Sequence, residues 1–489
     1  MILMSMILIL LLGGLAAWAS ESLSPNAPKW VAALSLIIAP YPIRYILYDL
    51  GTSTNEGWLI NEVTLWIQRL NITFHLAIDG LSLLLILLTL SMGLIAVMAA
   101  WKEIKTRTGF FYFNLLWSLA GVIGVFCALD LFLFFVFWEV MLVPMYLLVA
   151  IWGYENRRYA AMKFFLFTQA GGLLMLVSIS ALVLLNFQES GVLTFDYLDL
   201  IAHQLSPHAA FWVMLGFFIA FIIKLPIVPF HNWLPDAHTQ APTAVSVILA
   251  AVLLKTGGYG LIRFVLPMFP EVSVEFAPYA MALAGLTIIY GAVMAFSQQD
   301  LKRLIAYTSI SHMGFVLLGC YAMTQQAWQG AVMQMLAHGI SAAALFALVG
   351  AIQYRYHTRD LNELGGLWQV LPKLSAVGLF FVVASLGMPG LGNFVGEFLV
   401  LLGSFPSYPI FTIIAALGLI LAAVYSLAIA QRTFFGPLKL GEALDLDTRE
   451  ILMMTSMAVI LLWMGLHPQP LIDLAQHTLN QFPLGATIK

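Results

Sequence analysis

Four ionisable side chains lie inside strongly apolar stretches of the sequence: Glu139, Lys224, Lys255 and Glu397. Placing a charge at the centre of a membrane helix costs roughly 2.5–3.5 kcal/mol, so such residues are seldom incidental. A buried acid and a buried base also change each other's affinity for protons. These residues therefore predict a path for protons or small cations. A purely structural ion pair between Glu139 and Lys224 is the alternative.

Two of these residues stand beside sequences that break helices. Pro226 and Pro229 follow Lys224, and the segment 388–393, MPGLGN, precedes Glu397. Proline removes a backbone hydrogen bond and clashes with the preceding turn of a helix. A broken helix at membrane depth is tolerated only where it is buried in protein or lines a watery cavity. We therefore expect discontinuous helices at Lys224 and just before Glu397.

Four histidines extend this polar set. His231 and His238 frame the hinge HNWLPDAH and are predicted to line a cytoplasmic entrance; Pro235 between them and the lack of a third histidine nearby argue against a metal site. His312 and His338 lie within apolar segments. A neutral imidazole both donates and accepts, so these two are predicted to relay protons, with an interhelical hydrogen bond as the alternative.

Composition identifies the class of protein. The 489 residues are 62% hydrophobic and 9% charged, with a mean hydropathy of +0.94, whereas soluble domains carry about 25% charged residues. We expect an all-α polytopic membrane protein. Two cysteines, Cys127 and Cys320, lie in apolar runs and provide neither a disulfide framework nor an all-cysteine iron–sulfur site. No motif for phosphate or nucleic-acid binding is found, so no nucleic-acid partner is expected.

Fourteen apolar segments are long enough to cross a bilayer, which takes about 20 residues. They lie near 1–19, 28–48, 80–100, 110–128, 131–152, 163–186, 209–231, 240–265, 277–296, 303–323, 328–353, 372–404, 409–431 and 451–467. The predicted breaks fall in the seventh and the twelfth. Because five is odd, spans 4–8 and 9–13 would form two inverted five-helix repeats, as in many transporters. The predicted divisions are 1–108, 109–266, 267–431 and 432–489.

The loops differ in charge. Basic residues gather between spans 3 and 4, 5 and 6, 9 and 10, 11 and 12, and 13 and 14, whereas the connection 187–208 holds Glu189, Asp196 and Asp199 without lysine or arginine. The positive-inside rule makes the basic loops cytoplasmic. Both termini are therefore predicted to face outward, to the periplasm of a bacterial inner membrane.

Long motifs of the sequence resemble the antiporter-like membrane subunits of respiratory complex I, the proton-pumping NADH:quinone oxidoreductase. The motifs are FWEVMLVPMYLL, KLPIVPFHNWLPDAHTQAPTAVSVILAAVLLKTGGYGLIRF, SQQDLKRLIAYTSISHMG and GMPGLGNFVGEF. The resemblance implies that Glu139 pairs with Lys224, and that Lys255 continues a central polar axis together with His312, His338 and Glu397. In that family, the position of Glu397 is a glutamate in one of the three sister subunits and a lysine in the other two.

The resemblance also implies a non-redox translocase subunit without cofactors of its own. NADH, flavin, iron–sulfur clusters and quinone would be bound by partner subunits, and the partners would include sister antiporter-like subunits, within the lipid bilayer. The alternative is a subunit of a multi-subunit sodium/proton antiporter, since those chains share the central motifs. Glu397 favours the complex I reading.

Overall fold

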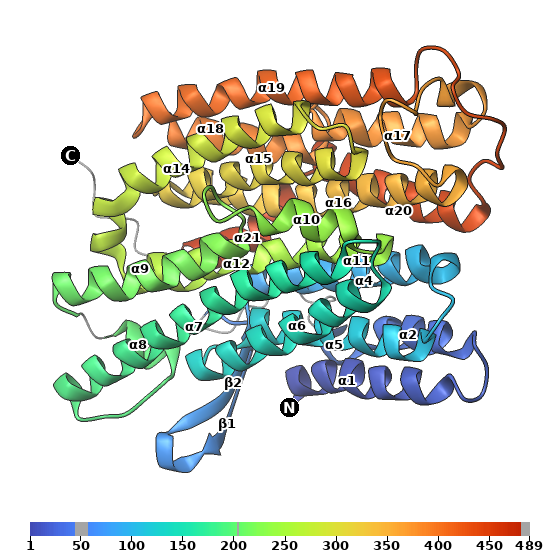
Figure 1. Cartoon of the computed structure of the whole chain (residues 1–489). Helices are drawn as coiled ribbons and strands as arrows, with labels where there is room; N and C mark the ends of the chain where they lie inside the picture. The colour runs from blue at the N-terminus through green and yellow to red at the C-terminus, as the bar shows by residue number, and fades with distance from the viewer. Residues whose placement is uncertain (45–56, 203–204, 481–489) are drawn as a thin grey trace.

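The computed structural model describes residues 1–44, 57–202 and 205–480, and shows a bundle of helices that run roughly side by side (Figure 1). Twelve helical stretches of this described part are long and apolar enough to cross a membrane. They are α1 (Ile2–Ser20), α4 (Gly80–Glu103), α5 (Thr108–Cys127), α6 (Leu131–Trp152), α7 (Arg157–Ser190), α9 (Pro207–Lys224), Thr243–Met268, α14 (Pro270–Phe296), α15 (Leu301–Tyr321), α16 (Gln325–Tyr356), α19 (Pro409–Thr433) and α20 (Thr448–Leu466).

Three shorter apolar helical stretches accompany them: Ala27–Ile43, which contains α2 (Ala27–Ile38), then α17 (Pro372–Ser385) and α18 (Gly392–Ser404). The all-α polytopic fold is confirmed. The count of fourteen spans stays a prediction, and positions 45–48 of the predicted second span lie outside the described residues. The division into four segments likewise stays a prediction.

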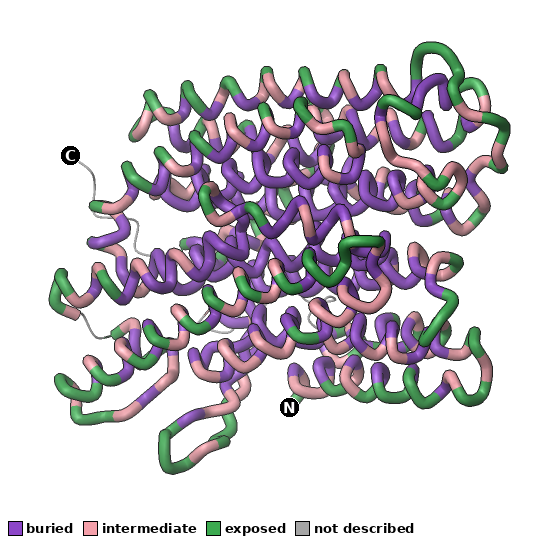
Figure 2. The backbone as a smooth tube through the Cα atoms, viewed as in Figure 1, coloured by how far each residue is buried: buried purple, intermediate pink, exposed green. Residues whose placement is uncertain are grey.

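The centre of the bundle is formed by three of these stretches. In Thr243–Met268 and α15, all residues of an apolar 18-residue segment are buried, and in α16 94% of them are. The corresponding share is only 28% in α20 and 39% in α1. Figure 2 shows this buried centre surrounded by helices whose outer faces are exposed. The central stretches carry Lys255, His312 and His338, so the protein buries its polar side chains where lipid cannot reach them.

Both predicted helix breaks are present. Helix α9 ends at Lys224, and the next helix, α10 (Trp233–Gln240), begins only after the proline-containing segment 225–232. Helix α17 ends at Ser385 and α18 begins at Gly392. Between them Gly387 adopts φ 81°, and a Cβ at this position would lie 2.8 Å from Oε2 of Glu397. Glycine is therefore required here both by the backbone and by the nearby carboxylate.

The central stretch Thr243–Met268 is not a regular α-helix. It consists of α11 (Thr243–Ile248), a π-helical segment (Leu249–Leu253), α12 (Leu254–Gly260), a second π-helical segment (Leu261–Val265) and α13 (Leu266–Met268). No pattern in the sequence predicts these two segments. Single π-helical turns inside α-helices are frequent at functional sites, and here they flank Lys255 on both sides.

A β-hairpin lies in the connection before α4 and was not predicted. Strands β1 (Ile60–Ile67) and β2 (Ile72–Ile78) pair antiparallel, with Ile60 opposite Ile78. Figure 1 shows the hairpin and the short helix α8 (Tyr197–Ile201) toward the left, and the α19–α20 connection at the opposite end.

Contacts place both ends of the described chain on the hairpin side. The amino group of Met1 lies 3.4 Å from the carboxylate of Glu62 in β1. The last helix, α21 (Gln469–Leu479), packs its backbone at Leu474 against Gly80, just after β2. Because α4 runs from Gly80, directly after the hairpin, to Glu103, the basic loop that follows it lies at the opposite face.

Candidate functional site

His312 and Glu397 meet in the second half of the bundle. Nδ1 of His312 on α15 lies 2.8 Å from Oε1 of Glu397 on α18, and the amide of Gln334 on α16 donates to the same oxygen at 3.0 Å. The other ring nitrogen of His312, Nε2, lies 3.1 Å from the Tyr425 hydroxyl and 3.3 Å from Oγ of Ser385. Four helices and the end of the broken α17 thus fix the orientation of this imidazole.

Lys255 and His338 form the adjoining pair. Nζ of Lys255 lies 2.9 Å from Nδ1 of His338 on α16 and donates to the carbonyl of Ala250 at 2.5 Å. The rings of His338 and His312 have centroids 5.4 Å apart. The structure therefore brings four of the predicted residues into one buried row, Lys255–His338–His312–Glu397. This proximity of two histidines on neighbouring helices was not predicted.

Lys224 and Glu139 lie near one another but form no ion pair within 4 Å in the described part of the chain. Nζ of Lys224 is 5.2 Å from the ring centre of Trp138 and 5.6 Å from that of Phe164. Oε1 of Glu139 lies against Gly172 of α7, where a Cβ would come within 2.5 Å. The structure therefore places the two residues in one region of the bundle without the direct pairing expected from the sequence.

The break after α9 packs against the helix that carries Lys255. A Cβ at Gly257 would lie 2.5 Å from the carbonyl oxygen of Phe221 and 2.8 Å from the backbone nitrogen of Leu225. Glycine permits this approach of two backbones. The end of α9 at Lys224 is therefore held against α12, two residues beyond Lys255.

His231 and His238 pack against different side chains. The ring of His231 lies 5.0 Å from that of Tyr290, whereas His238 stacks on Phe346 of α16 at 4.2 Å with an interplanar angle of 4°. Asp236 between them is bound by Lys163 at 2.6 Å and by Arg303 at 2.9 Å. The hinge carboxylate is thus occupied by cations, and no group of three or more metal-ligating side chains occurs among the described residues.

Several buried polar atoms along this row have no hydrogen-bond partner in the described protein. They are Oε1 of Glu139, Nζ of Lys224, both ring nitrogens of His238, Nε2 of His338 and Oε2 of Glu397. Buried polar groups in native proteins are nearly always satisfied, by protein or by ordered water. Ordered water is therefore the expected partner of these titratable atoms, in the row and in the neighbouring residues Glu139, Lys224 and His238.

Comparison with models of known protein families identifies a match that covers more than half of the chain. Residues 128–423 match the family described as NADH:quinone oxidoreductase/Mrp antiporter, transmembrane. The chain belongs to this family. The matched region begins just before α6 and ends within α19, so it contains every residue of the buried row.

Individual relatives of this family member are similar over nearly their full length. The NADH-quinone oxidoreductase subunit M of Pseudomonas aeruginosa is 52% identical over 100% of this chain and 99% of its own. Its counterpart in Escherichia coli K12 is 50% identical over 97% and 96%. The NADH-ubiquinone oxidoreductase chain 4 of Chondrus crispus is 40% identical over 93% and 91%.

Solved structures agree with these relatives. A chain of respiratory complex I from Thermus thermophilus superposes with a TM-score of 0.87 at 32% identity, covering 99% of this chain and 100% of the other. A chain of an archaeal membrane-bound sulfane sulfur reductase gives a TM-score of 0.84 at 25% identity, covering 94% and 75%. The resemblance expected from the motifs is therefore confirmed at the level of the family.

Sequence reasoning missed three polar residues that hold the row in this family member. Gln334, Ser385 and Tyr425 all contact His312 or Glu397, and all three are buried. Uncharged polar residues are common in membrane helices, so their types alone do not separate them from other serines and glutamines. Their only sequence signal is the position of Gln334 one helical turn before His338.

A second buried ion pair was also missed. Arg263, two turns after Lys255, donates to Asp79, the N-cap residue of α4, and both side chains are 1% exposed. The guanidinium also lies 5.1 Å from the ring of Trp58. This ion pair lies near the C-terminal end of the central stretch, on the hairpin side. His238 lies just before its N-terminal end.

Proposed function

We propose that this chain is a proton-translocating, non-redox membrane subunit of a proton-pumping NADH:quinone oxidoreductase. The observation that carries the proposal is the buried row Lys255–His338–His312–Glu397, in which neighbouring titratable atoms lie 2.8–2.9 Å apart within each pair. The names of the relatives at 50–52% identity support the assignment to this enzyme complex. Intramembrane ionisable residues that face the interior of a bundle are characteristic of proton relays.

The row works by passing a proton between groups that can each hold one. Nζ of Lys255 lies within hydrogen-bond distance of Nδ1 of His338, whose lone pair accepts the proton when the imidazole is neutral. Nε2 of His338 has no protein partner and releases a proton toward the His312 ring through water. His312 Nδ1 then exchanges it with the Glu397 carboxylate, while Tyr425 and Ser385 hold the ring in place.

Glu139 and Lys224 supply the switch in this proposal. Lys224 lies at the break of α9, which packs on α12 beside Lys255, and Glu139 lies near it on α6. In a low-dielectric interior a charge acts over several ångströms, so protonating or neutralising Lys224 changes how strongly Lys255 holds its proton. Neither residue needs to touch Lys255 for this effect.

The same proposal covers cofactors, partners and location. Redox chemistry belongs to partner subunits that bind NADH, flavin, iron–sulfur clusters and quinone, while this chain binds none of them. Sister antiporter-like subunits are its neighbours in a bacterial inner membrane. Both termini face the periplasm, because the hairpin side lies opposite the basic loops.

Exchange of sodium for protons is the competing function, because the matched family includes Mrp antiporters. Glutamate at position 397, rather than lysine, and the names of the relatives at 40–52% identity favour complex I.

Co-purification separates the two functions. A tagged chain isolated from solubilised membranes should bring NADH:quinone oxidoreductase activity with it, and vesicles containing that assembly should acidify when NADH is oxidised in the absence of sodium. Isolation without this activity, or proton movement that requires sodium, would favour the antiporter.

The orientation of the chain in the membrane is tested in intact cells. A cysteine added after Lys489 should react with an impermeant thiol reagent, whereas Lys105→Cys should react only after the membrane is opened.

A further inference from the structure

Lys302 is a buried lysine outside the row described above. The sequence places it among the charges of a cytoplasmic loop, but in the structure it is the second residue of α15 and is only 1% exposed. Its Nζ donates to the carbonyl of Ala241 at 2.5 Å. Within the described chain no carboxylate lies within ion-pair distance of it. A buried ammonium held only by a neutral acceptor is costly, so its presence calls for an explanation.

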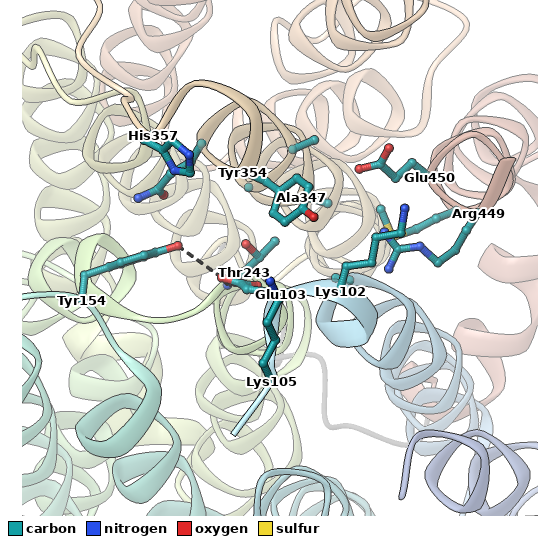
Figure 3. Close-up of a pocket in the computed structure, with 15 residues that line it drawn as sticks. Lys102, Glu103, Lys105, Tyr154, Thr243, Ala347, Tyr354, His357, Arg449 and Glu450 are labelled. Atoms are coloured by element: carbon teal, nitrogen blue, oxygen red, sulfur yellow. Dashed lines mark hydrogen bonds between the residues drawn. The ribbon is translucent and has the colours of Figure 1, made fainter. Parts of the chain in front are cut away.

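On its outer side Lys302 lies behind Tyr154, which lines two cavities at the face of the basic loops. Nζ lies 5.4 Å from the ring centre of Tyr154, and Tyr154 lines both a cavity of about 450 Å³ and a neighbouring one of about 460 Å³. Figure 3 shows Tyr154 pointing toward Glu103 and Thr243 across the first cavity. The Tyr154 hydroxyl donates to Glu103 at 3.2 Å, and both oxygens of Glu103 accept from the Thr243 N–H at 3.1 Å.

Charged groups surround Lys302 at this mouth without neutralising it directly. Arg359, Glu103 and Asp300 act on it electrostatically. Asp300 is held by Arg359 at 2.5 Å, and Glu103 is engaged by Tyr154 and Thr243. Each nearby acid is therefore already bound to another group, and none of them forms an ion pair with Lys302.

On its inner side Lys302 leads to His238. Its acceptor, Ala241, is the residue that ends α10, three positions after His238. The His238 ring is fully buried, has no hydrogen-bond partner for either nitrogen in the described protein, and stacks at 4.2 Å on Phe346 of α16, the helix that also carries His338. The contacts of Nζ with Tyr154 and with Ala241 thus place Lys302 between the cavity side and the helix that carries His238.

We propose that Lys302 is the residue through which protons pass from these cavities to His238 and on to Lys255. Neutral Lys302 takes a proton from cavity water onto its Nζ lone pair, and then gives it to a ring nitrogen of His238. One N–H bond forms as another breaks, so only a proton moves. This proposal rests on the proposed function and adds the uptake side of the path to it. Among basic side chains, lysine gives up its proton readily when buried, whereas arginine does not.

A structural role for Lys302 is the competing explanation. Its ammonium lies at the C-terminus of α10, where a positive charge stabilises the helix dipole. Lys302→Arg separates the two roles. Arginine keeps the charge and the donor to Ala241 but cannot be deprotonated in a protein. Lys439 provides the matched control, because it also donates to a backbone carbonyl, that of Asn362 at 2.9 Å, yet is exposed and lines neither cavity.

The experiment compares Lys302→Arg, Lys439→Arg and Lys255→Met as purified complexes in vesicles, with the rate of NADH-driven proton pumping per assembled complex as the readout. Dividing by the amount of complex removes differences in yield. Lys302→Arg should lower the pumping rate about tenfold or more, as expected when a proton-transfer group is lost, while Lys439→Arg matches the wild type.

Wild-type pumping by Lys302→Arg beside loss in Lys255→Met would overturn this inference, because Lys302 would then only cap α10. Wild-type pumping by both would instead overturn the proposed function. If Lys302→Arg does not assemble, His238→Phe takes its place. This variant keeps an aromatic ring on Phe346 but carries no proton. Lost pumping supports the path, and wild-type pumping rules it out.

Discussion

Nδ1 of His312 on α15 lies 2.8 Å from Oε1 of Glu397 on α18, although 85 residues separate them in the sequence. This contact joins the helix after the second break to the centre of the bundle. It also gives Glu397 a partner with which to exchange a proton, while its second oxygen has no partner in the described chain.

Glu397→Gln tests whether Glu397 must titrate. The amide keeps the size of the side chain and an oxygen that can accept from Gln334, but it cannot take up a proton. We expect normal assembly and a rate of NADH-driven pumping per complex lowered about tenfold or more. Glu442→Gln, a matched change at an exposed position, should have no effect. Normal pumping by Glu397→Gln would assign the residue a structural role.

Glu139 and Lys224 should behave as one unit although no direct ion pair joins them. Glu139→Ala and Lys224→Ala should each lower pumping about tenfold or more. The double variant should be little worse than either single one, because residues of one network are not additive. Pumping by reconstituted complexes measures all three, with exposed Glu189→Ala as the control. Additive losses would show that the two residues act independently.

The pair of Arg263 and Asp79 should matter for stability. Arg263→Met leaves the Asp79 carboxylate buried without its cation, which costs about 3–5 kcal/mol. The double variant Arg263→Met/Asp79→Asn should recover much of this loss, since asparagine also caps helices well. The amount of complex in membranes and its thermal inactivation report the effect, with exposed Arg69→Met as the control. An equally unstable double variant would contradict the explanation.

Asp447 gives a prediction with a defined dependence on pH. It caps α20 by accepting from the Glu450 N–H at 2.8 Å, and it binds Lys102 at 2.7 Å. Partial burial raises the pKa of the Asp447 carboxyl, but Lys102, the Glu450 N–H and Arg449 outweigh it and hold the pKa below its ordinary value of 3.8. The stabilisation is therefore complete above that ordinary value and is lost as the pH falls through the lowered one.

Asp447→Ala measures this contribution. The change should cost about 1 kcal/mol at neutral pH, seen as faster hydrogen exchange in the first turn of α20. The difference from the wild type should be constant from neutral pH down to mildly acidic pH and should shrink only in strong acid. A difference that vanishes near neutral pH would assign the effect to another group.

The sequence alone predicts the main features of the site but not its connections. Ionisable residues in apolar segments identify Lys255 and Glu397 because their cost at membrane depth is high. Proline and glycine identify both breaks. The proximity of His312 and His338 depends on how α15 and α16 pack, which residue types do not encode. The burial of Lys302 was missed because α10 folds over it, and a lysine beside a loop is ordinarily exposed.

The π-helical segment Leu249–Leu253 has a consequence for insertions and deletions in this region. A π turn holds one residue more than the α turn it replaces, so it amounts to an inserted residue that the helix has absorbed. Deleting Val252 would therefore remove the extra residue and restore an α turn, so that Lys255 keeps its direction toward His338. Deleting a residue from the regular turns of α11 would instead rotate every later residue of the helix by about 100°. The span should thus tolerate the loss of a residue at the π segment but not in the α-helical turns before it, and the Lys255–His338 distance in the two deletion variants would measure that difference.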